Sequence, residues 1–498
     1  MRTGKEYRET LRDDGRRVWV IGVGAIDDVT THPATRAMVY EYVAWYDRHA
    51  DPAWQDIVLA PPDASGVRTP WSFVVPTRPE HLRGMGRCYA ATTFPTAGNV
   101  THTPAYGHLI ALGVHDAVLQ RKAAPEQGPN AAAYRELIVR TGRFLTFCAG
   151  AATIGARLDP DPARRLALKL VRETDAGVIV SGKVGMHTSP AYAEDVYVGS
   201  HNGIEIGPHR ASFIVPVAAP GVTVVCRKTS VHHPSPFIAP LSSRYDELDG
   251  QMWLDDVFIP WERVFLTEAS PDPVASWLFW HQLYCWLAKA EFTLGLALAC
   301  ADALGLREHD ATIEYLVDLI VDVQTVRTCQ TAAELDPERS EAGFAIPNRS
   351  HVAAGSIAML KARQRMAEIL RTLPGSSLVV APADSDLASR EVGAGLDESF
   401  TGGGYTALQR SALLQLASDH VISSLDGRES AFELHANGGI PAWRGRLRRF
   451  FADYNTLANA VLRALPLEMP PIDLTHIREM PLAPRRAVSP PSPGPRRP

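Results

Sequence analysis

Paired cysteines are missing from the sequence. Its 498 residues hold only six cysteines, and no two of them stand at the CxxC spacing of a metal site or a redox pair. Secreted proteins rely on disulfides, whereas isolated thiols are typical of reducing compartments. The first residues are charged and carry no apolar core of a signal peptide. We therefore expect reduced thiols and a cytoplasmic location.

Charge of one sign is also missing. The chain has 50 Lys+Arg and 55 Asp+Glu, a formal net charge of −5, and no long basic run. Nucleic acids and anionic membranes are bound through positive fields, so we expect neither as a partner. The most apolar long stretch, residues 283–306, carries Lys289, Glu291 and Asp302. It is predicted to be a buried helix and not a membrane span, and the expected ligand is a small molecule.

The common catalytic motifs are absent. There is no GxxxxGK phosphate loop, no HExxH zinc motif and no GxSxG nucleophile elbow. The Gly22-Val-Gly24 pair lacks the third glycine of a dinucleotide fold, and Gly402-Gly-Gly404 is predicted to be a loop hinge. His232 and His233 have no third ligand at a useful spacing, so we predict no metal site.

Two compositional regions make up the first half of the chain. Residues 1–158 have a mainly helical pattern, and the clearest predicted helices cover 38–48 and 131–147. Residues 159–272 contain short β-branched runs between turn residues, at 178–180, 196–198, 213–215, 222–225 and 252–259. We expect these runs to form a compact antiparallel β-barrel or sandwich.

Long helical patterns return over residues 273–470. Apolar residues recur there at spacings of three and four, and further helices are predicted over 311–334, 353–373 and 407–424. Several long helices joined by short links are typical of an antiparallel four-helix bundle. Residues 471–498, rich in Pro and Arg, are predicted to be a disordered tail. The predicted fold class is α+β, mainly α.

The order of these regions and several phrases resemble a known family. The β region closes on Trp253-Leu-Asp-Asp-Val-Phe-Ile-Pro-Trp-Glu-Arg-Val, and His187-Thr-Ser-Pro-Ala-Tyr and Pro240-Leu-Ser-Ser-Arg-Tyr-Asp-Glu are further matches. The architecture resembles the acyl-CoA dehydrogenase-like flavoproteins: an N-terminal helical domain, a middle β domain and a C-terminal helical bundle. Within that group the chain is more similar to the 4-hydroxyphenylacetate 3-hydroxylase oxygenase family, which also contains chlorophenol monooxygenases and 4-hydroxybutyryl-CoA dehydratase. The resemblance extends from Thr3 to about Phe451.

The resemblance implies an FADH2-dependent monooxygenase. Such enzymes take reduced FAD from a separate flavin reductase, react it with O2, and hydroxylate a phenol or related aromatic through a flavin C4a-hydroperoxide. The protein has to keep the flavin dry and promote loss of the phenol proton. In relatives a neighbouring subunit completes the flavin cleft, so a homodimer or homotetramer is implied.

Three residues are implied as catalytic. The family phrase Gly-Arg-Thr-Pro-x-Tyr corresponds to residues 101–106 here, so Tyr106 is kept and the arginine has become His102. A histidine is shorter and lacks the arginine fork but can still donate a hydrogen bond to the flavin or to the substrate. His281 falls where chlorophenol hydroxylases carry a histidine thought to deprotonate the phenol, and it is our candidate base. Each residue also has a plainer interpretation: a polar loop residue for His102, packing for Tyr106 and a core histidine for His281.

Seven residues are implied at the flavin. Phe147 stands where phenylacetate hydroxylases carry a histidine against the ring, so that acid–base group is lost. The other six are Thr153, Thr188, Ser189, Arg428, Asn437 and Gly438. An arginine and glycine-rich amides suit a pyrophosphate, although Arg428 is equally expected as an ion pair within the bundle.

Two alternatives remain within the same family. The first is a flavin-dependent lyase like the dehydratase, whose iron–sulfur cluster needs a CxxxC pair; Cys88 has no companion at that spacing. The second is a diverged flavin-binding oxidase or partner subunit that no longer oxygenates. The substitutions at His102 and Phe147 favour that second alternative.

Overall fold

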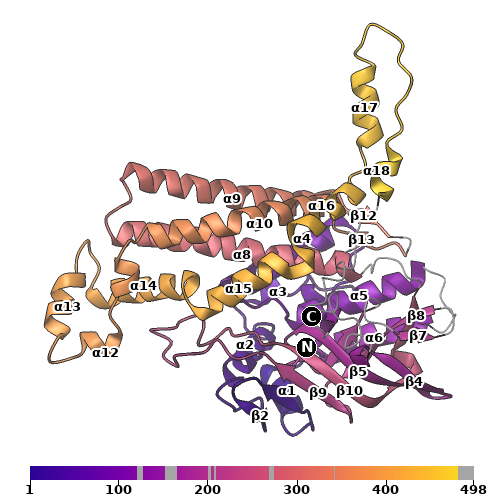
Figure 1. Ribbon diagram of the computed structural model, residues 1–498, viewed down its shortest axis with the longest axis horizontal. Helices are drawn as coiled ribbons and strands as arrows, with labels where there is room; N and C mark the ends of the chain where they lie inside the picture. The colour runs from indigo at the N-terminus through magenta and orange to yellow at the C-terminus, as the bar shows by residue number, and fades with distance from the viewer. Residues whose placement is uncertain are drawn as a thin grey trace, which may run out of the picture.

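The computed structural model describes residues 1–120, 127–151, 165–199, 204–206, 209–267, 274–340 and 342–480. A large sheet lies on one side of the molecule and a layer of long helices on the other (Figure 1). Helix α5 (Pro104–Gln120) packs against both parts, through α8 (Val274–Ala303) and strand β3 (Leu145–Ala151). The start of α5 is therefore held where the sheet meets the long helices.

The N-terminal helices confirm one of the two helices predicted there. The helices of this region are α1 Gly4–Leu11, α2 Arg36–Asp47, α3 Gln55–Val58, α4 Pro79–Thr93, α5 and α6 Gln127–Thr141. The helix predicted over 38–48 is α2. The helix predicted over 131–147 is wrong beyond Thr141, because Gly142 takes a left-handed backbone (φ 62°) and ends α6. The apolar residues that follow form β3.

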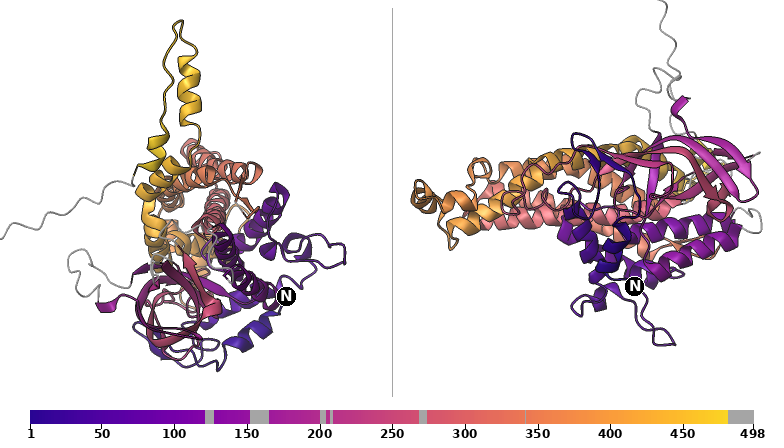
Figure 2. Two further views of the ribbon diagram at one scale, coloured as in Figure 1. Left: turned by 90° about the vertical axis from the view of Figure 1, so that its right-hand side faces the viewer. Right: turned by 90° about the horizontal axis from the view of Figure 1, so that it is seen from below.

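Eleven of the described strands form one twisted sheet in the order β11-β8-β6-β3-β5-β10-β9-β1-β2, with β4 beside β5 and β7 beside β8, while β12 and β13 pair only with each other. Its strands are β1 Val18–Val20, β2 Gly24–Ile26, β3, β4 Lys169–Thr174, β5 Gly177–Thr188, β6 Asp195–Val198, β7 Ile204–Ile206, β8 His209–Pro216, β9 Val222–Cys226, β10 Asp249–Pro260 and β11 Val264–Thr267. All five β-branched runs picked out in the sequence are strands. Figure 2 shows how strongly the sheet curls.

The prediction of a purely antiparallel sheet built only from residues 159–272 is wrong in two respects. Strands β1, β2 and β3 come from the first 158 residues, and β3 lies between β5 and β6. Two pairs are parallel, β1 with β9 and β3 with β6. Both parallel pairs join strands that are distant in sequence, which is what a parallel pair requires, since it needs a long crossover.

The long helices lie side by side (Figure 1). They bury Trp277, Trp280, Trp286 and Trp443 between them. They are α8, α9 Asp310–Leu335, α10 Arg349–Thr372, α14 Ala407–Val421, α15 Ser424–His435 and α16 Gly439–Phe450. Shorter elements between them are β12 Glu338–Arg339, β13 Ala345–Ile346, α11 Ser377–Val380, α12 Asp384–Leu387 and α13 Gly393–Phe400. By length and composition α8 alone among the described helices is long and apolar enough to cross a membrane, but 67% of its apolar window is buried, as in the core helix of a folded protein.

A helical arm leaves the body after α16 (Figure 1). It contains α17 Tyr454–Leu462, and the chain returns along it to α18 Thr475–Glu479. Asn459 fixes the returning segment through hydrogen bonds to the backbone N–H and C=O of Ile472. Residues 471–480, which we predicted to belong to a disordered tail, are thus ordered by contacts with the arm; residues 481–498 lie outside the described residues.

Candidate functional site

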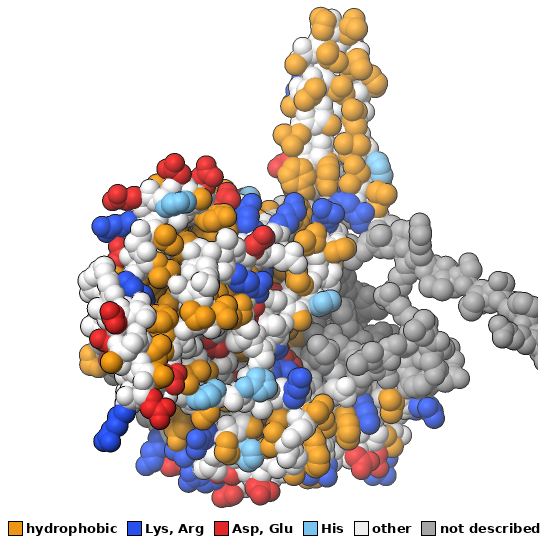
Figure 3. All heavy atoms as spheres, turned by 60° about the vertical axis from the view of Figure 1, so that its left-hand side comes forward, with side chains coloured by type: hydrophobic (Ala, Val, Ile, Leu, Met, Phe, Trp, Pro, Cys, Tyr) orange, Lys and Arg blue, Asp and Glu red, His pale blue; other side chains and the backbone are white. Residues whose placement is uncertain are grey.

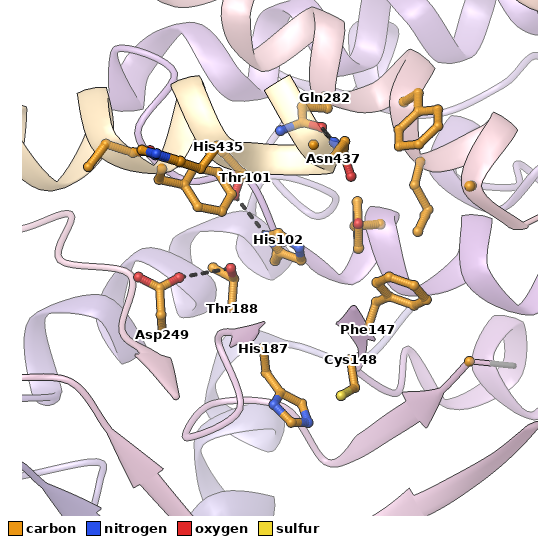
Figure 4. Close-up of a pocket in the computed structure, with 18 of the residues that line it drawn as sticks. Thr101, His102, Phe147, Cys148, His187, Thr188, Asp249, Gln282, His435 and Asn437 are labelled. Carbon is orange, nitrogen blue, oxygen red and sulfur yellow. Dashed lines mark hydrogen bonds between the residues drawn. The ribbon is translucent and has the colours of Figure 1, made fainter. Parts of the chain in front are cut away.

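A cavity of about 690 Å³ lies where the sheet, the start of α5 and helices α8, α15 and α16 meet (Figure 4). Its walls combine aromatic and apolar side chains with a few polar ones. The predicted site residues on its lining are His102, Tyr106, Phe147, Thr188, Arg428, Asn437 and Gly438. The fold therefore brings together seven of the ten residues predicted from sequence. Of the other three, Thr153 lies outside the described residues, and Ser189 and His281 stand behind the wall.

His102 and Tyr106 lie at the N-terminal end of α5. Pro104 opens the helix, and the two rings lie against each other with centroids 4.2 Å apart. The Nδ1 atom of His102 is 2.8 Å from the Thr101 hydroxyl, a contact drawn in Figure 4. Burial raises the pKa of Tyr106 well above its ordinary value, so its phenol stays protonated and can donate a hydrogen bond into the cavity.

Glu247 is a buried carboxylate beneath His102 that sequence reasoning missed. Its oxygens accept from the backbone N–H groups of Thr101 and His102, and from the hydroxyls of Thr101 and Ser189. Burial alone would raise the pKa of Glu247, but the neighbouring His102, then Arg428 and the backbone N–H of Thr101, lower it to about 2. The only sequence signal was its place at the end of the Tyr245-Asp-Glu phrase before β10.

His281 lies one layer behind the cavity. Its ring stands edge-on to Tyr106 at 5.6 Å and to Tyr89 at 4.8 Å, and Nδ1 is 3.8 Å from the Cys285 sulfur. It is 1% exposed and does not contribute to the described lining. Burial, together with the nearby His102, lowers the pKa of His281 to about 3, so the ring is neutral. The structure therefore separates our candidate base from the cavity by Tyr106.

The sheet supplies the floor of the cavity. Phe147 on β3 faces the cavity and stacks on Tyr197 of β6 at 5.8 Å. Thr188, at the end of β5, donates to Asp249 at 2.9 Å (Figure 4). Ser189 is fully buried with a left-handed backbone (φ 64°), and its hydroxyl donates to Glu247 instead of reaching the cavity. Ser189 therefore belongs to the support of Glu247.

Arg428 is already paired. Its guanidinium makes two hydrogen bonds to Asp249, at 2.8 and 2.5 Å, and one to Glu429. Arg227 also binds Asp249, so β10 and α15 are joined by a buried ion-pair network at the cavity edge. The alternative we kept open for Arg428, an ion pair, is what the structure shows.

The turn between α15 and α16 presents backbone groups and a second arginine. Asn437, Gly438 and Gly439 all have left-handed backbones, with φ of 57°, 85° and 62°. Asn437 donates to Gln282 of α8 at 2.5 Å (Figure 4). Arg446, which sequence reasoning missed, donates to the carbonyl of Asn437 at 2.7 Å.

Arg446 is a cation without a counter-ion in the described part of the chain. Its guanidinium rests on the rings of Phe279 and Trp443, at 4.5 and 4.7 Å, and no described carboxylate lies within ion-pair distance. Burial, with Arg449 nearby, lowers the pKa of Arg446 to about 10, so it remains charged at neutral pH. An unneutralised arginine beside a glycine-rich turn suits a phosphate or other anion.

Two family models match most of the chain in sequence. Residues 3–266 match "4-hydroxyphenylacetate 3-hydroxylase N terminal", and residues 274–465 match "4-hydroxyphenylacetate 3-hydroxylase C terminal". The chain belongs to the 4-hydroxyphenylacetate 3-hydroxylase family. The resemblance inferred from the phrases of the sequence is thereby confirmed.

Two of the curated relatives that match this chain are named as oxygenase components. The 4-nitrophenol 4-monooxygenase/4-nitrocatechol 2-monooxygenase oxygenase component of Rhodococcus opacus is 30% identical over 90% of this chain and 87% of its own length. The 4-hydroxyphenylacetate 3-monooxygenase oxygenase component of Thermus thermophilus is 28% identical over 87% of this chain and 91% of its own length. The predicted reaction class, FADH2-dependent aromatic hydroxylation in a two-component system, is confirmed at the level of the family.

Solved structures give the same result for the fold. The oxygenase component of 4-hydroxyphenylacetate 3-monooxygenase complexed with FAD and 4-hydroxyphenylacetate superposes with a TM-score of 0.84, at 25% identity, covering 93% of this chain and 99% of that one. The 4-hydroxybutyryl-CoA dehydratase of N. maritimus has a TM-score of 0.79 at 16% identity, which shows a shared fold only. The mixed helix-and-sheet fold is confirmed.

The cavity fits the flavin that the family uses. It is large, it is lined by aromatic faces such as Phe147 and Phe279, and its rim carries Arg446 and the left-handed turn at 437–439. Aromatic walls suit an isoalloxazine ring, and the cation beside a glycine-rich turn suits its pyrophosphate. FAD as the cofactor is confirmed for the family, and the donor set of this chain agrees with it.

Proposed function

We propose that this chain is the oxygenase component of an FADH2-dependent monooxygenase that hydroxylates a small phenol, with reduced FAD delivered by a separate reductase. The observation that carries the proposal is the cavity in which His102 and Tyr106 face apolar and aromatic walls beside a turn suited to a dinucleotide. When bound, the reduced flavin supplies the activation of O2. The dehydratase alternative has support only from a shared fold.

The residues of this chain divide the remaining work. Phe147, Leu278 and Phe279 exclude water from the ring and the substrate. Tyr106, kept as a neutral phenol, donates a hydrogen bond that orients a substrate oxygen. His102 and Phe147 replace the arginine and histidine that we expect in phenylacetate hydroxylases, so the substrate is a phenol without the carboxylate of 4-hydroxyphenylacetate.

The experiment supplies reduced FAD from NADH and a separate flavin reductase to the purified chain, in air, with a panel of phenols. The expected result is a hydroxylated product from neutral phenols, formed faster than from 4-hydroxyphenylacetate. The proposal is overturned if flavin is reoxidised with every phenol and no hydroxylated product appears; that result would favour the diverged oxidase.

The proposal includes a homo-oligomer. Apolar residues on the outer face of α9 are exposed at helical spacing: Ile313, Val317, Ile320 and Val321. Hydrophobic side chains also cover much of the projecting arm in Figure 3. Leu457 and Val461 are among the exposed apolar residues of this arm. These two surfaces suit contact with a second copy, so we propose a homodimer or homotetramer.

The proposal also includes a three-part division, with boundaries near residues 158, 272 and 470, in which β1, β2 and β3 of the first part join the sheet of the second. It includes a cytoplasmic location as well. The six free cysteines, five of them buried, support a reducing compartment. Fractionation of cells that express the tagged chain checks the location, and recovery in the periplasm or the medium would contradict it.

A further inference from the structure

His102, Thr101 and Glu247 form a chain of hydrogen bonds that ends at the cavity. Thr101 Oγ1 is 2.8 Å from His102 Nδ1 and 2.8 Å from Glu247 Oε2. Glu247 is fully buried, whereas His102 is 8% exposed and lines the cavity. These hydrogen bonds thus connect a buried carboxylate, through a hydroxyl, to an imidazole that a ligand can reach.

The direction of these hydrogen bonds fixes the tautomer of His102. A hydroxyl has one proton to donate, and an ionised carboxylate can only accept. Glu247 accepts hydrogen bonds from two backbone N–H groups and from the Ser189 hydroxyl, as an ionised carboxylate does, so the Thr101 proton points to Glu247 in a charge-assisted hydrogen bond. The Thr101 oxygen then accepts from His102, which must carry its proton on Nδ1. The Nε2 atom of the neutral ring is left with a bare lone pair.

Resting on the proposed function, we propose that His102 is the base that deprotonates the phenol, and that Thr101 and Glu247 are positioning residues that fix its tautomer and stabilise its charged form. The phenol O–H bond breaks, its electron pair stays on the phenolate oxygen, and the proton joins Nε2 of His102. The resulting imidazolium keeps its Nδ1–H bond to Thr101 and lies 3.9 Å from the Glu247 carboxylate.

The Glu247 carboxylate is fixed in position near the His102 imidazolium by several hydrogen bonds. Two backbone N–H groups, at 3.0 and 2.8 Å, and the Ser189 hydroxyl, at 3.0 Å, fix the carboxylate independently of the Thr101 hydroxyl. Tyr42 supports the same loop by donating to the carbonyl of His102 at 3.0 Å. Removing the Thr101 hydroxyl therefore interrupts the hydrogen-bonded series between Glu247 and His102, while Glu247 keeps its other hydrogen-bond donors.

The groups that face His102 from the packed elements favour this role over His281. The charge of Glu247, in the loop before β10, lies near His102, and the Tyr106 ring of α5 packs against it. His281 of α8 interacts with His102 electrostatically, and Arg428 of α15 does so with Glu247. His281 is screened from the cavity by Tyr106, and its ring lacks a carboxylate contact within ion-pair distance among the described residues.

The test compares Thr101→Val, which has the same shape without the hydroxyl, with Thr101→Ser, which keeps it. Single-turnover hydroxylation is followed at pH 8 with an ordinary phenol, whose pKa is about 10 like that of tyrosine, and with a nitrophenol that is already ionised. We expect Thr101→Val to slow the ordinary phenol about 100-fold and the nitrophenol less than threefold, and Thr101→Ser to resemble the wild type. Equal losses with both phenols, or no loss, overturn the proposal.

A second readout does not depend on activity. Reaction of His102 with diethyl pyrocarbonate, followed by peptide mass spectrometry across pH, reports the apparent pKa of His102 in the FAD-bound protein. Because a nearby carboxylate stabilises the imidazolium, Glu247→Gln should lower this apparent pKa by about one unit, and Thr101→Val should lower it in the same direction. If the apparent pKa of His102 is unchanged in Thr101→Val, the proposed roles of Thr101 and Glu247 are contradicted, even if no phenol is hydroxylated. If the apparent pKa changes as expected but the wild type hydroxylates no phenol, only the proposed function is contradicted.

Discussion

At the scale of single residues, the site depends on charged residues that stand in no recognisable sequence motif. Glu247 lies 145 positions from the backbone N–H of His102 that it binds, and Arg446 is one of several arginines on α16. Their roles come from burial and partners that only the folded chain provides. His102, Tyr106 and Phe147 could be predicted because they stand in local phrases that match a family pattern. Ser189 was predicted to bind the flavin because of its place in a family phrase. Its actual contact, with the distant Glu247, could not be predicted from the sequence.

Arg446 gives the first residue-scale prediction. If its unpaired guanidinium binds the FAD pyrophosphate, Arg446→Gln should weaken FAD binding about tenfold, as expected for losing one charge-assisted hydrogen bond. Fluorescence titration with FAD measures this. Arg444→Gln, an exposed position on the same helix, is the matched control and should leave the affinity within twofold. Equal effects in both variants would show general electrostatic attraction instead of a pyrophosphate contact.

At the scale of elements, periodicity predicted well wherever the chain stays in one state. The runs at 178–180 and 213–215 are strands because their β-branched residues alternate or cluster between turns. Residues 145–151 were missed because an apolar run directly after a helix continues the helical pattern, and only the left-handed Gly142 ends it. The parallel pairing of β3 with β6 is a tertiary choice that no local pattern contains.

The turn that joins α15 to α16 gives the element-scale prediction. Gly438 has φ of 85°, and a Cβ there would come within 2.7 Å of the Ala442 Cβ. Gly438→Ala should therefore destabilise the protein by about 1–2 kcal/mol and weaken FAD binding, because the amides of the turn move. Thermal unfolding and FAD titration measure the two effects.

Gly427 is the matched control for this turn. It lies inside α15, and a Cβ there would meet nothing within 4 Å. Gly427→Ala should stabilise the helix by up to about 1 kcal/mol and leave FAD binding unchanged. If Gly438→Ala is as harmless as Gly427→Ala, the turn is not a fixed part of the site.

At the scale of the whole molecule, the surface carries a prediction about assembly. Light scattering coupled to size-exclusion chromatography should find at least two copies in solution. Val317→Lys together with Ile320→Lys should dissociate the contact made through α9, because charged side chains cannot be buried there without partners. Lys361→Glu on the neighbouring helix α10, exposed but not in the apolar stripe, is the control. A monomeric wild type would contradict the proposed oligomer.

Incorporation of isotopic oxygen tests the central claim, that this cavity hydroxylates a phenol with O2. The protein, reduced FAD and a neutral phenol are mixed without oxygen, and buffer saturated with ¹⁸O2 is then added. The mass of the product should show one ¹⁸O atom in a newly formed hydroxyl, with product formed in proportion to the protein-bound reduced flavin. Reoxidation of the flavin with hydrogen peroxide as the sole product and no labelled phenol would contradict the account.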